Sequence, residues 1–423
     1  MLTRRVFLRG SAIAMAGMGQ APLWLARAAA TPGKKRKTLV AIFMRGAADG
    51  LNIVAPFGDP KYRDLRPTLA MQPPRRGDDN ENTGPFGSLI DLDGKFGLNP
   101  GLRPLKTLWD QKQLAIVEAT GSPDPSRSHF DAQDYMESGT PGKTGNGWLN
   151  RALGDAGPDS SPLRAVALSK RLPRTLQGPY EAIALGNAQD FNISDQERLA
   201  ILKNMYSLTP DAPLRRTGMD AFDAMKMLQS IDKGAPMNPQ GPVGPGVVGA
   251  NARPTYQRGG QLGANLQQLA RLMKSDTGVE AAFAEIDGWD HHQNESGQLS
   301  NLLNQFSNGI AAFCQDLGDR MEDVVIVTMS EFGRTAEENG AGGTDHGHGS
   351  LMMVMGGPVQ GGKIYGEWPG LEKENLFEGR DLAVTTDFRT VLSELVRDHL
   401  GQKDLTSVFP GFQPAPPLGL LRS

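Results

Sequence analysis

Histidine is scarce in this chain, and most of its histidines lie close to carboxylates. Five of the six fall in three short polar segments, as His129, His291 with His292, and His346 with His348. Asp290 precedes the histidines of the second segment, and Asp345 precedes those of the third. Imidazole and carboxylate groups are common ligands of zinc and related divalent ions. Histidines scattered for structural reasons would not group in this way, so the sequence predicts a metal or hydrolytic centre.

The segment 323–349 supplies one part of this centre. It begins with the apolar run 324–327, which indicates a buried strand. Glu331 follows the end of this strand, and a glycine-rich loop then carries Asp345 and His346. Open α/β sheets bind their ligands beyond the carboxyl ends of strands. We therefore predict that Glu331, Asp345 and His346 contribute to a metal site at this edge.

Two other predicted strands lead to candidate ligands. Residues 38–44 are apolar on both faces, as in a central parallel strand, and a glycine turn containing Asp49 follows them. Asp49 could be a simple turn former, but its place after a central strand favours a functional role. The strand predicted at 279–286 leads to Asp290 and His292. In an extended chain, residues two apart point to the same side, so both can reach one ion.

A helix predicted at 129–138 carries a candidate nucleophile at its start. Ser128 stands at the N-cap position, and Gly139 ends the helix. The free amides and the dipole at a helix N-terminus favour a developing anion, which suits a nucleophilic hydroxyl. Ser128 could equally be a plain cap. The adjacent Arg127 and His129 favour the catalytic interpretation.

The first residues indicate export. Residues 1–30 contain the pair Arg4-Arg5, a short apolar run and small residues suited to cleavage, as in a twin-arginine signal peptide. The run is shorter than the roughly 20 apolar residues that a membrane span needs. Because the leader holds four arginines and no acid, its removal lowers the net charge from −3 by four, to −7. We expect a periplasmic or otherwise exported protein that meets the twin-arginine translocase and does not bind nucleic acid.

The rest of the chain is expected to fold as one α/β domain. We predict that residues 31–423 form three layers, α/β/α, around a mainly parallel central sheet. A long loop insertion at 56–100 and a largely helical one at 179–274 interrupt it. The single cysteine, Cys314, can form no internal disulfide and is expected in the core. His291 should point away from the side on which Asp290 and His292 lie, and we assign it no role.

These motifs together resemble the exported family named domain of unknown function 1501, which is grouped with the alkaline phosphatase and sulfatase superfamily. The resemblance rests on the leader and on the segments FMRGAADGLN, SRSHFDAQDYMESG, DGWDHH, MSEFGRTAEENG and GTDHGHG. It implies an alkaline phosphatase-like fold with Ser128 as the nucleophile. The ligands that it implies are Asp49, Asp290, His292, Glu331 and His346, with Asp345 beside the last. Phe332 stands where phosphatases of this superfamily place a metal-binding histidine, so a two-metal centre would lose one ligand.

The resemblance implies a metal-dependent hydrolase of phosphate or sulfate esters. A divalent ion (zinc, manganese or calcium) would polarise the ester of a small anionic substrate or glycan. Arg127 or Arg334 would hold the anionic ester, and His129 would be a general acid or a further ligand. The alternative is a non-catalytic envelope protein whose altered site binds a structural metal or an acidic glycan, or serves assembly. A metal-dependent mutase is the third hypothesis.

Overall fold

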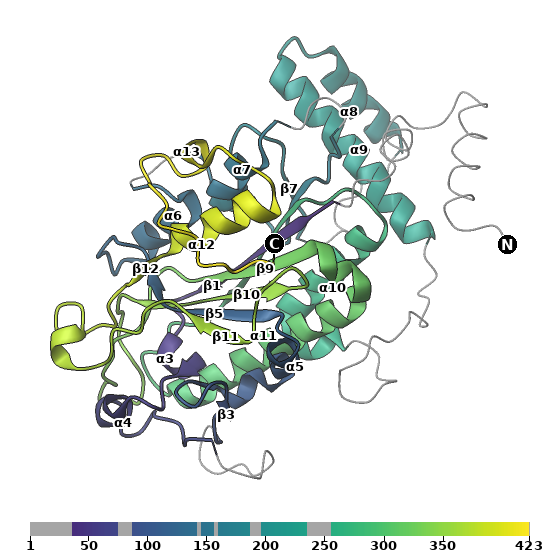
Figure 1. Cartoon of the computed structure of the whole chain (residues 1–423). Helices are drawn as coiled ribbons and strands as arrows, with labels where there is room; N and C mark the ends of the chain where they lie inside the picture. Colours follow the sequence, from purple (N-terminus) through teal and green to yellow (C-terminus); the bar gives the residue numbers. More distant parts are fainter. Residues whose placement is uncertain are drawn as a thin grey trace.

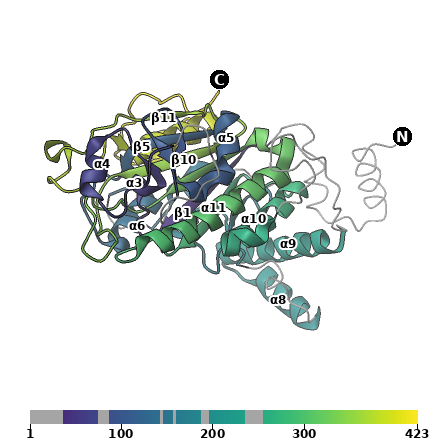
Figure 2. The ribbon, with the colours of Figure 1, turned by 90° about the horizontal axis from the view of Figure 1, so that it is seen from below.

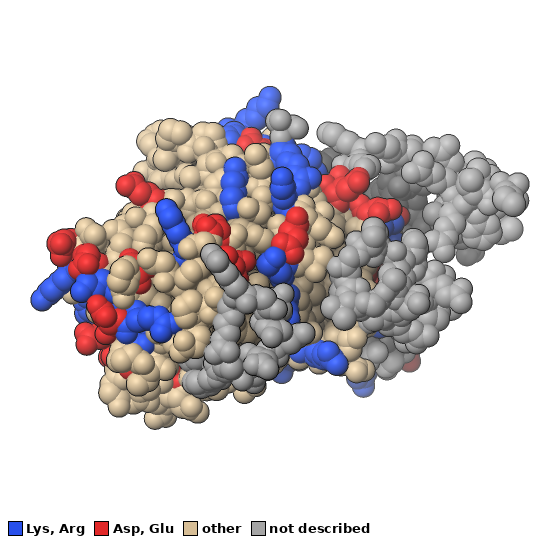
Figure 3. All heavy atoms as spheres, turned by 60° about the horizontal axis from the view of Figure 1, so that its bottom comes forward, with Lys and Arg blue, Asp and Glu red and all other residues tan. Residues whose placement is uncertain are grey.

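The computed structural model describes residues 36–74, 87–141, 145–155, 160–186, 196–234 and 255–422. The expected twin-arginine leader, residues 1–30, lies outside this part of the chain. Within the described ranges, no helix is both long enough and apolar enough to cross a membrane. On the face shown in Figure 3, acidic and basic side chains are interspersed rather than separated by sign.

A single sheet forms the centre of the described structure (Figure 1). Its nine strands are β1 (Thr38–Arg45), β5 (Leu114–Gly121), β6 (Ala165–Ala167), β7 (Ile183–Ala184), β8 (Ala281–Asp287), β9 (Val324–Met329), β10 (Ser350–Gly356), β11 (Lys363–Tyr365) and β12 (Thr386–Asp387). Their order is β11-β5-β10-β9-β1-β8-β6-β7, and β12 also pairs with β5. Neighbouring strands are parallel, except that β10 runs antiparallel to β9 and β5. The prediction of a mainly parallel central sheet is confirmed.

The sequence of β1 explains why the sheet is buried on both sides. Leu39, Ala41 and Phe43 belong to one apolar cluster. The alternating residues Val40 and Ile42 belong to the other. Successive side chains of a strand point to opposite faces, so an apolar run without alternation requires cover on each face.

Helices provide this cover and give three layers (Figures 1 and 2). One face carries α5 (Lys106–Asp110), α10 (Gly260–Lys274) and α11 (Glu295–Leu317), and the other carries α6 (His129–Ser138), α7 (Trp148–Leu153), α12 (Phe388–Glu394) and α13 (Leu405–Val408). In α11 the buried residues include Leu299, Leu303, Phe306 and Ile310. This spacing of three or four residues places one apolar stripe against the sheet. The predicted α/β/α architecture is confirmed.

Both predicted insertions contain secondary structure of their own. The first holds α4 (Pro60–Leu65), β3 (Ile90–Asp91) and β4 (Gly97–Leu98), directly after α3 (Gly50–Ile53) and β2 (Val54–Ala55). Strands β2, β4 and β3 form a small antiparallel sheet, so the described residues of this region contain a sheet where we expected a loop. The second holds α8 (Gln196–Leu208) and α9 (Ala212–Gly234), a pair that extends from the body (Figures 1 and 2). Its two ends are not an insertion, because β7 belongs to the central sheet and α10 covers one face of that sheet.

Candidate metal centre

The carboxyl ends of three adjacent strands support one polar site. Strands β9, β1 and β8 lie side by side in parallel, so the loops that follow them leave at the same edge of the sheet. The loop after β8 carries Asp290 and His292. His129 is the first residue of α6, which follows β5, and His346 lies in the loop between β9 and β10. The topology therefore brings together four side chains from distant parts of the sequence.

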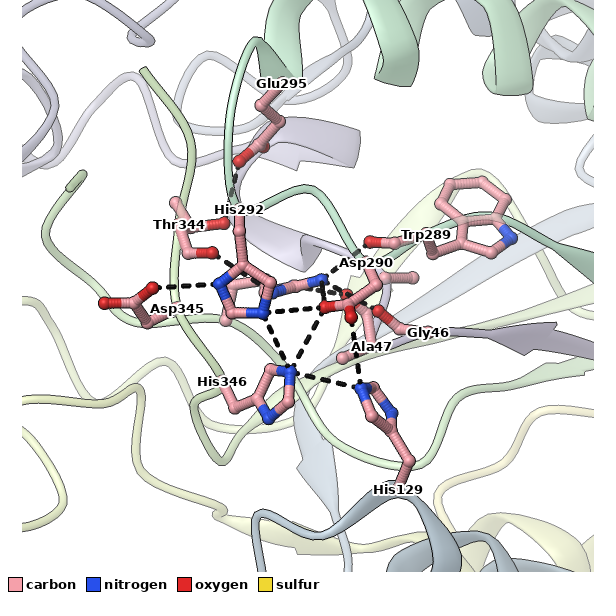
Figure 4. A network of polar contacts seen from close by, with 12 residues as sticks. Gly46, Ala47, His129, Trp289, Asp290, His292, Glu295, Thr344, Asp345 and His346 are labelled. Atoms are coloured by element: carbon pink, nitrogen blue, oxygen red, sulfur yellow. Dashed lines mark hydrogen bonds and ion pairs between the residues drawn. The ribbon is translucent and has the colours of Figure 1, made fainter. Parts of the chain in front are cut away.

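The donor atoms of these four side chains converge (Figure 4). His346 Nε2 lies 3.1 Å from His129 Nε2, from His292 Nε2 and from Asp290 Oδ1. His292 Nε2 is 3.0 Å from Asp290 Oδ1, and His129 Nε2 is 3.5 Å from Asp290 Oδ2. Ligand atoms of a tetrahedral zinc ion are about 3.3 Å apart when each is about 2.0 Å from the metal. The geometry of His129, Asp290 and His346 therefore suits one ion, with His292 beside it.

The opposite ring nitrogen of each histidine faces an acceptor. The Nδ1 contacts are Glu331 Oε1 for His129 (2.8 Å), Asp345 Oδ1 for His292 (2.9 Å) and the carbonyl oxygen of Arg127 for His346 (3.0 Å). Carbonyl and ionised carboxylate oxygens only accept hydrogen bonds, so the ring proton belongs on Nδ1 and Nε2 carries a lone pair. Several lone pairs and a carboxylate oxygen then face one another at about 3 Å. A bound cation stabilises this arrangement of electron-rich atoms.

Glu331 and Asp345 thus have a different role from the one that the sequence suggested. Rather than entering the cluster, each carboxylate binds the far side of a histidine ring and fixes its orientation. Burial raises the pKa of Glu331, but hydrogen bonds from His129, from Gln133 and from the Gly46 amide outweigh it and lower that pKa. The hydrogen bond from His292 lowers the pKa of Asp345. Both groups are therefore ionised acceptors at neutral pH.

The sequence from residue 36 to residue 403 matches the family described as "Protein of unknown function (DUF1501)". The chain belongs to this family. No curated protein matches the sequence. Among solved structures, the lipoteichoic acid synthase LtaP from Listeria monocytogenes is similar at 10% identity and a TM-score of 0.31, over 75% of this chain and 65% of LtaP. Alkaline phosphatase from the Antarctic bacterium TAB5 is similar at 12% identity and a TM-score of 0.29, over 76% of this chain and 91% of that enzyme. Likenesses this remote support no inference about activity.

Asp49 of this DUF1501 protein lies outside the cluster, contrary to its assignment as a ligand. Its two carboxylate oxygens accept hydrogen bonds from Arg66 Nη1 (2.5 Å) and Nη2 (2.9 Å). Both side chains are buried, and Arg66 also donates to the carbonyl oxygens of Thr335 and Ala336. Burial raises the pKa of Asp49, but the charge and hydrogen bonds of Arg66 outweigh it and lower that pKa. Through Arg66, this carboxylate anchors the loop that follows β9.

A second buried acid supports the histidine loop from the start of α11. Glu295 at the start of α11 is fully buried, and its Oε2 accepts a hydrogen bond from Thr344 Oγ1 (2.7 Å) (Figure 4). Burial and the nearby charge of Asp49 raise the pKa of Glu295 well above its ordinary value. Glu295 is therefore held in its neutral form next to the residue that precedes Asp345. Nothing in the spacing of the sequence pointed to this contact.

Arg127 and Ser128 of this DUF1501 protein, the two other residues predicted to be catalytic, have different surroundings. The Arg127 side chain donates from Nη2 to Glu378 (2.7 Å) and from Nε and Nη2 to Asp381 (3.0 and 2.5 Å), so it is not available to hold an ester. Ser128 is the N-cap residue of α6, as predicted, but its hydroxyl makes no capping hydrogen bond. The helix ends at Gly139, whose φ of 67° is left-handed, as the glycine there predicts.

Arg334 is a central structural residue of the site, and the sequence suggested only an ester-binding role for it. Its guanidinium is buried and donates to four backbone carbonyl oxygens and one carboxylate: Ala47 O (2.8 Å), Gly46 O (2.9 Å), Trp289 O (2.9 Å), Thr344 O (3.1 Å) and Asp290 Oδ1 (2.6 Å). Partial burial raises the pKa of Asp290, but the hydrogen bond and charge of Arg334 outweigh it and lower that pKa. Arg334 therefore joins three loops and holds Asp290 as an anion.

Close approach of these loops requires glycine at two positions. Gly46 has a φ of 116°, and a Cβ there would lie 2.7 Å from the Asp290 amide nitrogen. A Cβ on Gly347 would lie 2.3 Å from the carbonyl carbon of Arg334. Both distances are far below an ordinary contact, so any side chain would force the loops apart. The glycine-rich composition of these segments is thus a packing requirement of the site.

Phe332 forms an apolar wall beside the cluster. Its ring centroid lies 5.1 Å from the centroids of both His129 and His346, and the side chain is buried. The remaining two histidines of the motifs lie elsewhere: His291 is buried, with its pKa lowered to about 4 chiefly by burial, and His348 stacks on Phe377. As expected, His291 takes no part in the cluster.

Proposed function

We propose that this protein is an exported, metal-dependent hydrolase of phosphate or sulfate esters. One observation carries the proposal. The Nε2 atoms of His129 and His346 and the carboxylate of Asp290 converge, and each imidazole is oriented by an acceptor on its Nδ1. Histidine ligands oriented by carboxylates or carbonyl oxygens are the usual construction of a catalytic zinc site. The leader sequence motivates the export part of the proposal.

The donor set fits a borderline transition metal. Two imidazoles and a carboxylate, with His292 as a further imidazole, suit zinc better than calcium, which prefers six to eight oxygen ligands. When bound, the ion would polarise the ester oxygen and raise the acidity of a nearby hydroxyl. His129, Asp290 and His346 would hold it. Manganese is the second choice because it accepts the same ligand types.

Ser128 is the proposed nucleophile. It precedes the ligand His129 in sequence, is partly exposed, and its hydroxyl is not used as a helix cap. The N-terminal end of α6, a helix of ten residues, attracts the negative charge of a phosphate or sulfate group. Glu331 keeps the Nδ1 proton of His129 in place, which leaves Nε2 as the coordinating atom. Loss of the Ser128 hydroxyl should therefore abolish turnover while the ion stays bound.

The second candidate function is that of a non-catalytic envelope protein with a structural metal. Phe332 favours it, because an apolar ring packs against two of the ligand histidines where another ligand could stand. Such a wall limits the centre to one ion. A single ion can still activate a nucleophile, so the hydrolase remains the leading proposal.

The test begins with elemental analysis of the purified mature protein. About one equivalent of zinc is expected, because one set of ligands converges. A double variant, Asp290→Asn with His346→Ala, should lose the metal. A matched control, His348→Gln, changes a histidine of the same loop that lies outside the cluster and should retain it. If the wild-type protein takes up no divalent ion even on titration, the hydrolase proposal is wrong.

Activity then separates the two candidates. The zinc-loaded protein should hydrolyse an aryl phosphate or an aryl sulfate, and Ser128→Ala should remove this activity without changing the zinc content. Hydrolysis that persists in Ser128→Ala would move the nucleophile to water. A protein that binds zinc but cleaves neither ester class supports the envelope-protein alternative.

A further inference from the structure

A cleft of about 480 Å³ adjoins the candidate metal centre. Asp345, which orients His292, lines it. Arg380 also lines it, and its Nη2 donates to the carbonyl oxygen of His346 (2.7 Å). The cleft and the metal centre therefore share the histidine loop as a common wall. Its volume lies within the range of about 300–1,000 Å³ that is typical of small-molecule sites.

Most acids in the cleft are already engaged. Glu338 accepts hydrogen bonds from the amides of Thr68 and Leu69. Asp345 accepts from His292 and from Asn339 Nδ2 (3.3 Å). Glu372 lies 3.8 Å from Lys61 Nζ. The remaining acid of the lining, Glu337, is exposed to solvent. Three of the four carboxylates of the lining are thus held by groups of the protein, and the lining carries four acids and three cations.

Two cationic side chains of the lining face the cleft with capacity to bind a ligand. Arg380 uses Nη2 on the His346 carbonyl oxygen, and its Nε lies 3.6 Å from Asp381 Oδ1, so Nη1 remains for a ligand; its side chain is 43% exposed. Lys373 is exposed on the segment that also supplies the buried Leu371 and Leu376 to the lining. A guanidinium and an ammonium beside apolar side chains suit an oxyanion attached to a compact carbon skeleton.

On this basis, and resting on the proposed function, we propose that the cleft binds a second oxyanion of the substrate. The substrate class is then an ester that carries another phosphate, sulfate or carboxylate group besides the one that is cleaved. Arg380 and Lys373 are the residues that recognise this second group. Arg127 and Arg334, which the sequence suggested for anion binding, are held by acids and carbonyl oxygens elsewhere in the site.

Calorimetric titration with two probes tests this proposal. The probes are inorganic phosphate and propane-1,3-diyl bisphosphate, which carries two phosphates on a three-carbon chain. The full-length mature protein is used with and without zinc. We expect the bisphosphate to bind about ten-fold more tightly than phosphate, the contribution of one charge-assisted contact. The double variant Arg380→Gln, Lys373→Gln should lose this advantage and bind phosphate as the wild type does.

A second double variant serves as the matched control. Arg397→Gln with Lys403→Gln removes one arginine and one lysine that are not among the residues lining the cleft, so it should keep the advantage of the bisphosphate. The proposal is overturned if the bisphosphate binds no more tightly than phosphate, or equally well to the wild type and the cleft variant. Failure of the hydrolase proposal gives a different result: the protein binds no zinc or cleaves no ester, whatever the affinities of the two probes.

Discussion

His129 and His346 face each other through their Nε2 atoms at 3.1 Å. The Nδ1 of His129 contacts Glu331, and the Nδ1 of His346 contacts a backbone carbonyl oxygen, so in the neutral form of each ring the proton lies on Nδ1 and Nε2 carries a lone pair. Two lone pairs at this distance repel unless a cation lies between them.

Removal of the carboxylate behind His129 should weaken metal binding without removing a ligand. Glu331→Ala is expected to lower zinc affinity by about 10–100-fold, because the Nδ1 of His129 loses its acceptor. Glu331→Gln should lose less, because its amide oxygen can still accept. Competition with a chelator measures both. Glu118→Gln is the matched control, since Glu118, in β5, is as buried as Glu331 but does not contact the cluster. Equal affinities for Glu331→Ala and the wild type would contradict the role given to Glu331.

Arg334→Lys should show that the site needs the planar shape of the guanidinium as well as its charge. A lysine cannot reach four carbonyl oxygens and Asp290 together, so zinc affinity should fall about ten-fold or more. The free energy of unfolding should fall by about 1–3 kcal/mol, the cost of leaving a buried carbonyl oxygen without its donor. Arg66→Lys is the comparison, because Arg66 is equally buried but binds Asp49. It should lose stability while zinc affinity changes little. Chemical unfolding and zinc titration separate the two effects, and unchanged zinc affinity in Arg334→Lys would count against the model of three joined loops.

Phe332→His should strengthen the centre. The new imidazole would start from a ring that already lies 5.1 Å from both His129 and His346. An added nitrogen ligand is expected to tighten zinc binding by about ten-fold. Phe332→Leu keeps the apolar wall and should leave the affinity near that of the wild type. Weaker binding in Phe332→His than in Phe332→Leu would show that the wall itself is required.

His399 gives a prediction about pH and stability that is independent of the metal. Its side chain is buried, and burial lowers its pKa to about 4, from an ordinary value of 6.5. The unfolded chain therefore takes up a proton between pH 6.5 and 4 that the folded chain resists. Stability from this group is complete above pH 6.5 and is lost as the pH falls through this window, by up to about 3 kcal/mol.

Urea unfolding at pH 7.0, 5.5 and 4.5 checks this sign. His399 Nε2 contacts the carbonyl oxygen of Thr38 (3.0 Å), and a glutamine can keep a donor there. His399→Gln should be close to the wild type in stability at low pH and should lose less stability on acidification. Identical pH profiles for the two proteins would refute the assignment.

The sheet could be foreseen from sequence because its strands are apolar on both faces. The run 38–44 required cover on each side, and the structure provides it. The direction of β10 could not be foreseen. An apolar run looks the same whichever way it pairs, and only the connection from β9, which lacks a crossover helix, makes the antiparallel arrangement possible.

The sequence predicted which residues form the site better than it predicted whether each one would bind the metal or another side chain. Asp290, His292 and His346 come together because the ends of parallel strands meet at one edge, which is a rule of topology. Whether a carboxylate touches the ion or a histidine ring depends on side-chain directions within about 3 Å, as for Glu331 and Asp345. Asp49 lies outside the cluster because it pairs with Arg66, which lies in a predicted loop with no periodic pattern. Spacing along the chain carries no information of that kind.

The reversed direction of β10 has a consequence for the loop that carries the histidines. Because β9 and β10 are hydrogen-bonded neighbours of opposite direction, the chain leaves and re-enters the sheet at adjoining points. Residues 330–349 are therefore a tethered ring of chain whose base is fixed by the sheet before any ion arrives. Most of the entropy lost on closing such a ring is accounted for by folding, and little remains to oppose ion binding. Changes in the length of this ring near its tip, around Gly340 and Gly342, would leave the register of both strands intact.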